Sequence, residues 1–346
     1  MKANYLVFAL CLSALTACQK NKESQTADID DSKVLVEKES RYTVEILDDE
    51  ALEIISTDVE ISLLATGFTW TEGPLWVEEG QYLLFSDIPQ NKVYKLDAAG
   101  DTSTYLQPSG YSGKGNYSNE PGSNGLILDS NGDLILMQHG DRRIARMKAR
   151  LDQPNADFET LVDKYQGQRF NSPNDGVFDK KGNLYFTDPP YGLPPEFMGK
   201  ELDFQGVYCF LNTGELLLLD SLSRPNGIAL SPKEDKLYVA VSDEKHAVWY
   251  QYDLAATGKV SNKKIFYDAT GLVKPGGANG LPDGMEVHSK GYLFATGPGG
   301  LWIFSPEGKA LARIYTGQLT SNCAFTADEK YLFLTAHKDI LRVRLN

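Results

Sequence analysis

The sequence is poor in the residues that build metal cages from nitrogen and sulfur. Its 346 residues include four histidines and four cysteines, so a tetrahedral Zn²⁺ site of the Cys/His type is disfavoured. No H-E-x-x-H pair, Walker loop or G-x-S-x-G elbow occurs. Zinc-protease, nucleotide-phosphate and serine-hydrolase chemistry of these common kinds therefore has no support, and nothing suggests a dinucleotide cofactor.

Positive charge is also scarce. Lys and Arg number 34 against 47 Asp and Glu, which gives a formal net charge of −13 at pH 7. Proteins that bind nucleic acid neutralise phosphates with Lys and Arg, so we predict no nucleic-acid partner. An acidic surface is compatible with a bound cation or a neutral substrate.

Long apolar runs are missing except near the N-terminus, at residues 5–17. This run is shorter than the roughly 20 residues that span a bilayer. Lys2 precedes it and Leu15-Thr16-Ala17-Cys18 ends it, a pattern typical of a signal peptide. Leu-Thr-Ala-Cys resembles the lipobox of bacterial lipoproteins. A signal peptide cleaved elsewhere and a buried apolar helix are the alternatives.

The lipobox reading predicts how the chain is divided and where it resides. Residues 1–17 form a lipoprotein-type signal peptide, and the polar stretch 18–40 forms a flexible tether after a lipidated Cys18. The protein is then an extracytoplasmic bacterial lipoprotein, on the periplasmic face or the cell surface, whose lipid anchor is its one membrane contact. Cys209 and Cys323 remain in the globular part, and we expect two free, mostly buried thiols.

A short β-rich segment recurs six times. The copies occupy residues 82–87, 134–139, 184–188, 237–242, 292–297 and 331–336. Their interval of roughly 40 to 50 residues is that of propeller blades. Several copies follow a turn signal such as Asn131-Gly132 or Lys290-Gly291.

A second series precedes the first by about ten residues. It begins each time with a polar residue, at Glu72, Asn124, Asn174, Asn226, Asp283 and Asn322. In five of these six copies a glycine follows one or two places later. Each unit thus reads as a strand, a tight turn and a second strand, with two outer strands completing a blade. We predict an all-β, six-bladed β-propeller over residues 41–346, with four-stranded blades around a central metal-binding channel. Residues 47–55 are the one modest helical candidate.

The polar residues that open the innermost strands are expected to face the propeller axis together. Two carboxylates and four amides converge there, and Ca²⁺ takes six to eight oxygens from such groups and water. A single Asn-Gly is more often a turn than a ligand. A turn does not require Glu72 and Asp283 at the same position, however, and two such carboxylates repel unless a cation separates them. We therefore predict one divalent cation, Ca²⁺ first, with Mg²⁺, Mn²⁺ or Zn²⁺ as alternatives.

The second strand of each hairpin ends where the first begins. Asp87, His139, Asp188 and the pair Ser242-Asp243 should therefore lie on the same face as the ring. His139 is a candidate acid, base or substrate donor at this mouth. Asp188 leads into residues 189–193, a proline-rich loop able to roof the site.

Several motifs in order resemble the senescence marker protein/gluconolactonase/luciferin-regenerating enzyme family. They are Glu72-Gly73-Pro74-Leu75-Trp76, Ser172-Pro173-Asn174-Asp175-Gly176, Pro225-Asn226-Gly227-Ile228 and Pro282-Asp283-Gly284-Met285. The segments 138–143 and 188–192 look like the bacterial gluconolactonase branch of that family. The resemblance implies a six-bladed propeller that hydrolyses sugar lactones and related esters with one divalent cation.

The resemblance also implies roles for individual residues. Glu72, Asn226 and Asp283 would be metal ligands, with Asp283 also the general base. Asn174 would be a further ligand or a substrate contact. Asn124 would contact either the ion or the substrate, and Asn322 would be only a turn residue.

Recognition of the sugar hydroxyls should differ from that of the animal branch of the family. That branch carries an arginine two places before the position of Asn174, whereas this chain has Ser172. Arg169, His139 and Tyr191 are the candidates that replace it.

The predicted function is a metal-dependent lactonase, gluconolactonase-like, whose substrate is a small-molecule lactone. The cation would polarise the carbonyl and Asp283 would act as general base. One alternative is a hydrolase of another ester or phosphoester at the same site, since a fold does not determine a substrate. The other is a non-catalytic propeller that binds sugar or protein around a structural ion. A polar mouth containing His139 and Asp188 favours an enzyme.

Overall fold

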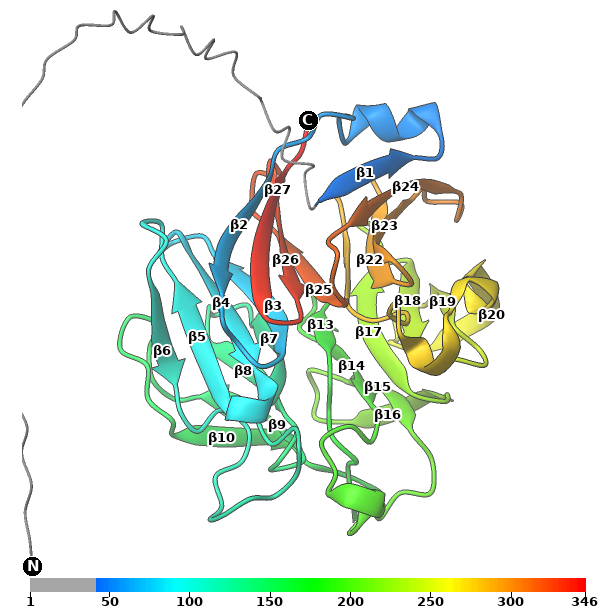
Figure 1. Ribbon diagram of the computed structural model, residues 1–346. Helices are drawn as coiled ribbons and strands as arrows, with labels where there is room; N and C mark the ends of the chain where they lie inside the picture. Colours follow the sequence, from blue (N-terminus) through cyan, green and yellow to red (C-terminus); the bar gives the residue numbers. More distant parts are fainter. Residues whose placement is uncertain (1–41) are drawn as a thin grey trace, which may run out of the picture. The chain divides into compact units, whose positions relative to one another are not determined.

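The computed structural model describes residues 42–346, which form a six-bladed β-propeller of antiparallel sheets (Figure 1). The fold predicted from the repeats is confirmed. The predicted signal peptide and tether lie outside the described residues. Within these residues the helices are 3-10 turns of three to five residues, and none is long and apolar enough to cross a membrane.

The first three blades follow the chain in order, with the innermost strand first. Blade 1 contains β3 (Thr71–Val77), β4 (Tyr82–Asp87), β5 (Lys92–Leu96) and β6 (Thr102–Leu106). Blade 2 contains β7 (Ser123–Leu128), β8 (Leu134–Gln138), β9 (Arg143–Met147) and β10 (Phe158–Val162). Blade 3 contains β13 (Gly176–Phe178), β14 (Leu184–Asp188), β15 (Gly206–Phe210) and β16 (Leu216–Ser221). A small hairpin of β11 (Lys164–Tyr165) and β12 (Gln168–Arg169) precedes blade 3.

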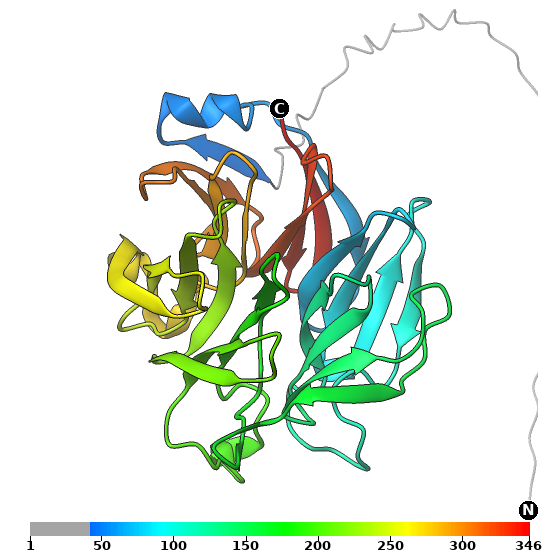
Figure 2. The ribbon, with the colours of Figure 1, turned by 180° about the vertical axis from the view of Figure 1, so that it is seen from behind.

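The last three blades include the two strands nearest the N-terminus. Blade 4 contains β17 (Pro225–Leu230), β18 (Lys236–Val241), β19 (Val248–Leu254) and β20 (Val260–Asp268); blade 5 contains β21 (Met285–Val287), β22 (Leu293–Gly297), β23 (Gly300–Phe304) and β24 (Ala310–Tyr315), with β1 (Thr43–Ile46) added outside; blade 6 contains β25 (Thr320–Phe325), β26 (Tyr331–Ala336), β27 (Asp339–Arg344) and β2 (Ile61–Thr66). Figure 2 shows the same sheets from behind.

Blade 6 is completed by a strand from the beginning of the described chain. Strand β2 pairs antiparallel with β27, and Ile61 lies opposite Val343. The two strands lie side by side in Figure 1, one blue and one red. This pairing joins the first blade to the last and closes the ring.

The core lies between neighbouring blades because each sheet packs both of its faces. All six residues of β4 and all five of β8 are buried. Between blades 4 and 5, the rings of Trp249 and Phe304 lie 5.3 Å apart. Burying one such large apolar side chain contributes about 1.5–3 kcal/mol, so the closed ring of blades is held mainly by these contacts.

Three of the polar-glycine pairs, at Glu72, Asn124 and Asn226, lie within innermost strands rather than at turns, whereas Asn174 and Asp283 come just before β13 and β21. The pairing register of β3 shifts between Glu72 and Leu75, and similar bulges occur near the starts of β7, β17 and β25. Gly73 has φ 50°, and a Cβ there would lie 2.1 Å from the backbone oxygen of Asn124 in the next blade. A Cβ on Gly227 would lie 2.2 Å from the backbone oxygen of Asp283. Glycine therefore lets the polar residues of adjacent blades approach each other.

Two smaller expectations are also confirmed. Cys209 and Cys323 are free and buried. The modest helical candidate at residues 47–55 contains a 3-10 helix, η1 (Asp49–Glu53), which Asp48 begins by accepting a hydrogen bond from the backbone of Glu50.

Candidate active site

A cavity of about 210 Å³ lies where the innermost strands begin. The structure brings into its lining six of the residues selected from the sequence, which are Glu72, Asn124, Asn174, Tyr191, Asn226 and Asp283. They come from five successive blades and from the loop after β14. The expectation that these side chains share one face of the propeller is therefore met.

Hydroxyl side chains at the ends of second strands hold these residues in place. Ser86 Oγ donates to the backbone oxygen of Asn124 at 2.8 Å, and Thr187 Oγ1 donates to that of Asn226 at 2.7 Å. The side-chain amide of Asn226 donates to Ser242 Oγ at 3.2 Å, and Ser242 in turn donates to the Pro282 carbonyl. The amide nitrogen of Asn226 is thus engaged, which leaves its amide oxygen available to a ligand.

Both carboxylates of the ring have a raised proton affinity. Burial, followed by the charge of Asp283, raises the pKa of Glu72 well above its usual range. Burial, followed by the charges of Asp175 and Glu120, raises the pKa of Asp283. Glu72 Oε2 accepts a hydrogen bond from the Gly73 backbone at 3.1 Å, but no cationic side chain pairs with either acid within the described part of the chain. The site therefore favours a bound positive charge.

The available donor atoms fit a hard cation. Asp283 Oδ1 and Asn124 Oδ1 are buried and have no hydrogen-bond partner among residues 42–346. In that same range no three acidic, histidine or cysteine side chains come together as a metal cage, because amides supply half of the predicted ligand set. Carboxylate and amide oxygens in this combination are the donors that Ca²⁺ prefers.

His139 lies behind the cavity rather than in its lining. It follows β8, is fully buried, and places Nδ1 3.8 Å from Glu120 Oε2. Burial lowers the pKa of His139 to about 3, so its imidazole is neutral. Arg169 also lies outside the lining, where its guanidinium donates to the Asp141 carbonyl at 2.8 Å.

The buried carboxylates Asp87 and Asp188 hold the chain that leads to the site. Asp188 accepts hydrogen bonds from the backbone nitrogens of Asn171 and Ser172, both at 2.8 Å. Asp87 does the same for Thr69 and Trp70 at 3.0 and 3.2 Å. Each thus fixes the segment just before a ring residue.

The prediction that Asn322 is only a turn residue is wrong, because it lies within the innermost strand β25 and is buried. It lines a second cavity of about 260 Å³ in the channel, together with Asp175 and Glu286. Burial raises the pKa of both carboxyls to about 7.

Two charged residues in the cavity lining were not selected from the sequence. Glu120 lies in the loop between β6 and β7, and burial raises its pKa to about 7. Arg224 precedes β17 in a left-handed conformation with φ 47°, and its backbone nitrogen donates to Gln205 Oε1 at 2.8 Å. Neither residue occupies the repeated polar position that opens each innermost strand, so the repeat did not indicate them.

Comparisons with known proteins agree with one another. Residues 70–338 match the sequence profile of the SMP-30/gluconolactonase/LRE-like region. A gluconolactonase from Zymomonas mobilis is 40% identical over 303 residues, which cover 85% of this chain and 83% of the relative. The solved structure of a gluconolactonase from Xanthomonas campestris has a TM-score of 0.74 at 28% identity, covering 88% of this chain and 95% of its own. Diisopropyl-fluorophosphatase of Loligo vulgaris is 26% identical over 286 residues, 78% of this chain and 86% of its own.

Proposed function

Because the chain belongs to the SMP-30/gluconolactonase/LRE-like family, we propose that it is a lactonase that opens a sugar lactone such as gluconolactone with water. One observation of the structure carries this proposal. Buried carboxylate and amide oxygens meet in a cavity, and Asp283 Oδ1 has no partner among residues 42–346. The gluconolactonase relatives support the substrate class.

The site residues divide into ligands and substrate contacts. A divalent cation, Ca²⁺ first and Mg²⁺, Mn²⁺ or Zn²⁺ as alternatives, would be held by Glu72, Asn174, Asn226 and Asp283 and would supply a Lewis acid for the lactone carbonyl. Asn124, Asn174 and Tyr191 line the same cavity and would orient the lactone ring against the reacting carbonyl.

Asp283 would act as the general base. It takes a proton from the attacking water as the oxygen of that water bonds to the carbonyl carbon. The bond between that carbon and the ring oxygen then breaks, and the proton passes to the ring oxygen, which gives a hydroxy acid.

A lactone-opening assay tests this function. Purified protein with Ca²⁺ should open glucono-1,5-lactone and release acid, which a pH indicator records above the spontaneous rate. Folded, cation-loaded protein that opens no member of a lactone panel would contradict the proposal and support a sugar- or protein-binding propeller.

A phosphoester or fluorophosphate is a second candidate substrate, because one relative is named diisopropyl-fluorophosphatase. The same cavity would serve, since a Lewis acid polarises a phosphoryl oxygen as it does a carbonyl oxygen. Comparing kcat/KM for glucono-1,5-lactone and diisopropyl fluorophosphate decides between them. A higher value for the fluorophosphate would replace the lactonase assignment.

Residues 1–40, outside the described part, are proposed to act in localisation. Signal cleavage before Cys18 and lipidation of that cysteine would leave the propeller anchored on the extracytoplasmic face. Mass spectrometry of the mature N-terminal peptide should show a lipid on Cys18, and Cys18→Ser should release the protein from the membrane fraction. An unmodified Cys18 in membrane-bound protein would contradict this.

A further inference from the structure

Glu120 presents an unpaired carboxylate to the cavity of the active site. The loop that carries it joins β6 to β7 and is pinned near its start by Asn91, whose Oδ1 accepts from three successive backbone nitrogens at 2.8–3.1 Å. About a third of the Glu120 side chain, 36%, is exposed, and its place in the lining turns it toward the cavity. Within residues 42–346 its carboxylate accepts no hydrogen bond. Its acceptor capacity is therefore free for a ligand.

His139 supports Glu120 from behind. Both ring nitrogens of His139 are buried and have no hydrogen-bond partner among the described residues, and Nδ1 lies 3.8 Å from Glu120 Oε2. On its other side, Gly192 packs so closely that a Cβ there would lie 2.4 Å from the Cβ of His139. The backbone nitrogen of His139 donates to Gly122 in the Glu120 loop at 3.1 Å. Among the described residues, the carboxylate within 4 Å of the imidazole is that of Glu120.

The chemistry of a sugar lactone matches this free acceptor. Every ring hydroxyl is a hydrogen-bond donor, and an ionised carboxylate only accepts. With a pKa of about 7, the Glu120 carboxyl is ionised above neutral pH, and hydrogen bonds to an ionised group are about twice as strong as neutral ones. A site built to bind a substrate hydroxyl discriminates against an analogue that lacks it, because the buried protein group is then left unpaired.

We propose that Glu120 is a specificity-determining residue that accepts hydrogen bonds from the hydroxyls of a polyhydroxylated lactone, and that His139 is a positioning residue that holds the Glu120 carboxylate in place. This inference rests on the proposed lactonase function and names its substrate class more closely. It gives His139 a role through Glu120, since the imidazole does not reach the cavity.

Two lactones with the same ring test the role of Glu120. Glucono-1,5-lactone carries hydroxyls, whereas δ-valerolactone is the same six-membered ring ester without them. In Glu120→Gln, kcat/KM for gluconolactone should fall roughly 10- to 150-fold, the contribution of one hydrogen bond to a charged group. Most of this fall should be in KM, and it should exceed the fall for δ-valerolactone at least tenfold. Equal falls for both lactones, or no fall for gluconolactone, would overturn the proposal.

A double-mutant cycle tests the role of His139. The preference for gluconolactone is the ratio of its kcat/KM to that of δ-valerolactone. His139→Leu should lower this ratio when Glu120 is present. It should change the ratio little in Glu120→Gln, because a positioning residue acts through its partner. His139→Asn keeps an amide donor near the position of Nδ1 and should restore much of the preference. Additive effects of the two substitutions, or equal losses in the Leu and Asn variants, would contradict positioning through Glu120.

The same measurements separate this inference from the proposed function. Wild-type protein that opens neither lactone would overturn both. Wild-type protein that opens both lactones, combined with an unchanged preference in Glu120→Gln, would overturn this inference alone. Thermal melts of each variant with Ca²⁺ show that the compared proteins are folded.

Discussion

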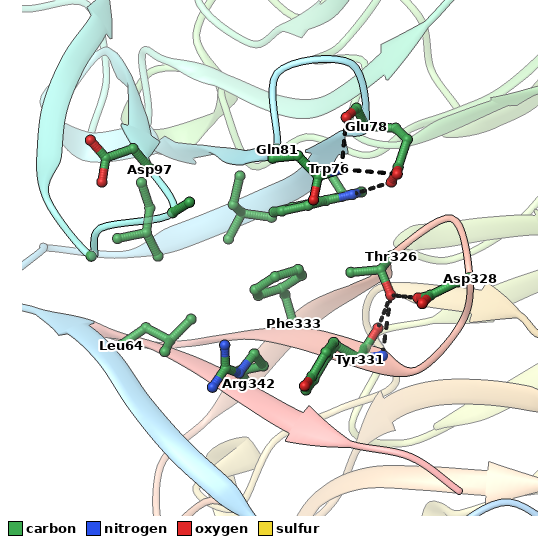
Figure 3. A pocket seen from close by; sticks show the side chains of 14 residues that line it. Leu64, Trp76, Glu78, Gln81, Asp97, Thr326, Asp328, Tyr331, Phe333 and Arg342 are labelled. Atoms are coloured by element: carbon green, nitrogen blue, oxygen red, sulfur yellow. Dashed lines mark hydrogen bonds between the residues drawn. The ribbon is translucent and has the colours of Figure 1, made fainter.

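Two cavities of similar size differ in how their polar groups are satisfied. The active-site cavity of about 210 Å³ contains Asp283 Oδ1 and Asn124 Oδ1, which have no partner among residues 42–346. A groove of about 300 Å³ between blades 1 and 6 (Figure 3) is lined by aromatic rings and charged side chains. There the Glu78 carboxylate accepts hydrogen bonds from Trp76 Nε1 at 2.6 Å and from Gln81 Nε2 at 2.9 Å. Gln81 Nε2 also donates to the backbone carbonyl of Glu78 at 2.8 Å.

No described residue that lines the groove has a buried polar side-chain atom without a hydrogen-bond partner. Figure 3 shows the hydroxyl of Thr326 bonded to Asp328. The ring of Trp76 stacks on Phe333 at 5.2 Å, and the Arg342 guanidinium lies 4.9 Å from the Tyr331 ring. The groove is therefore a seam between blades whose side chains satisfy one another. Unsatisfied buried oxygens, rather than cavity size, distinguish the site from the seam.

Among the changes to the active-site cavity, removal of the cation should have the largest effect. Without it, Glu72 and Asp283 repel across the ring, so chelation should reduce gluconolactone opening to the spontaneous rate, and Ca²⁺ should restore it. A ligand at about 100 times its Kd adds about 2.7 kcal/mol to the stability of the folded state, so the melting temperature should rise with Ca²⁺. Activity and melting that are both indifferent to chelator would contradict the cation site.

Substitution of the proposed base should come next. Asp283→Asn should lower kcat by roughly 10²- to 10⁴-fold, the contribution of general-base catalysis, while the amide preserves the shape of the side chain. Glu286→Gln is the matched control, because Glu286 is a carboxyl in the same channel on the other side of the ring. Stopped-flow kinetics with a pH indicator measure both variants, and similar losses in the two would contradict the assignment of Asp283.

A methyl group at Gly227 should have a smaller effect. Its Cβ would lie 2.2 Å from the backbone oxygen of Asp283, so Asp283 must move, and a shift of about 1 Å in a catalytic group costs on the order of 100-fold in rate. Gly271→Ala is the matched control, because a Cβ there meets nothing within 4 Å. If kcat/KM for gluconolactone is the same in both variants, the close approach of the blades does not position Asp283.

A substitution in the groove should have the opposite effect, lowering stability while leaving turnover unchanged. Phe333 is buried and stacks on Trp76, so Phe333→Ala should reduce the free energy of unfolding by about 3–5 kcal/mol. Turnover per folded molecule should stay that of the wild type, since the ring lies outside the active-site cavity. Urea denaturation and a lactone assay measure the two effects. A specific loss of turnover without a loss of stability would make the groove part of the site.

The repeats predicted the fold and the five polar ring residues of the cavity lining because both follow one period. Glu72, Asn226 and Asp283 occupy the same position in their blades, and that position is visible in the sequence. Glu120 was missed because its loop belongs to no repeat. The strand phase placed His139 at the end of β8, but phase does not reveal which residues line a cavity. His139 is fully buried outside the lining, whereas Glu120 lies in it.

The closure of the ring was also beyond the sequence pattern. Strand β2 pairs with β27 across more than 270 residues, for example Ile61 with Val343, and no local signal connects such distant segments. The Asn-Gly pairs carried a local signal for a turn. Bulges and inter-blade packing hold these pairs within strands instead.

Closure by β2 and β27 has a consequence for the synthesis of the protein. A ribosome that has completed blade 5 has already produced every proposed cation ligand, from Glu72 to Asp283. Strand β2 must nevertheless wait for the end of the chain, because it finds its partner β27 only when residues 339–344 have been made. While the residues after Asp283 are made, the nascent chain therefore carries all the proposed ligands without an enclosed site, and catalytic competence should arise in one step at the end of translation.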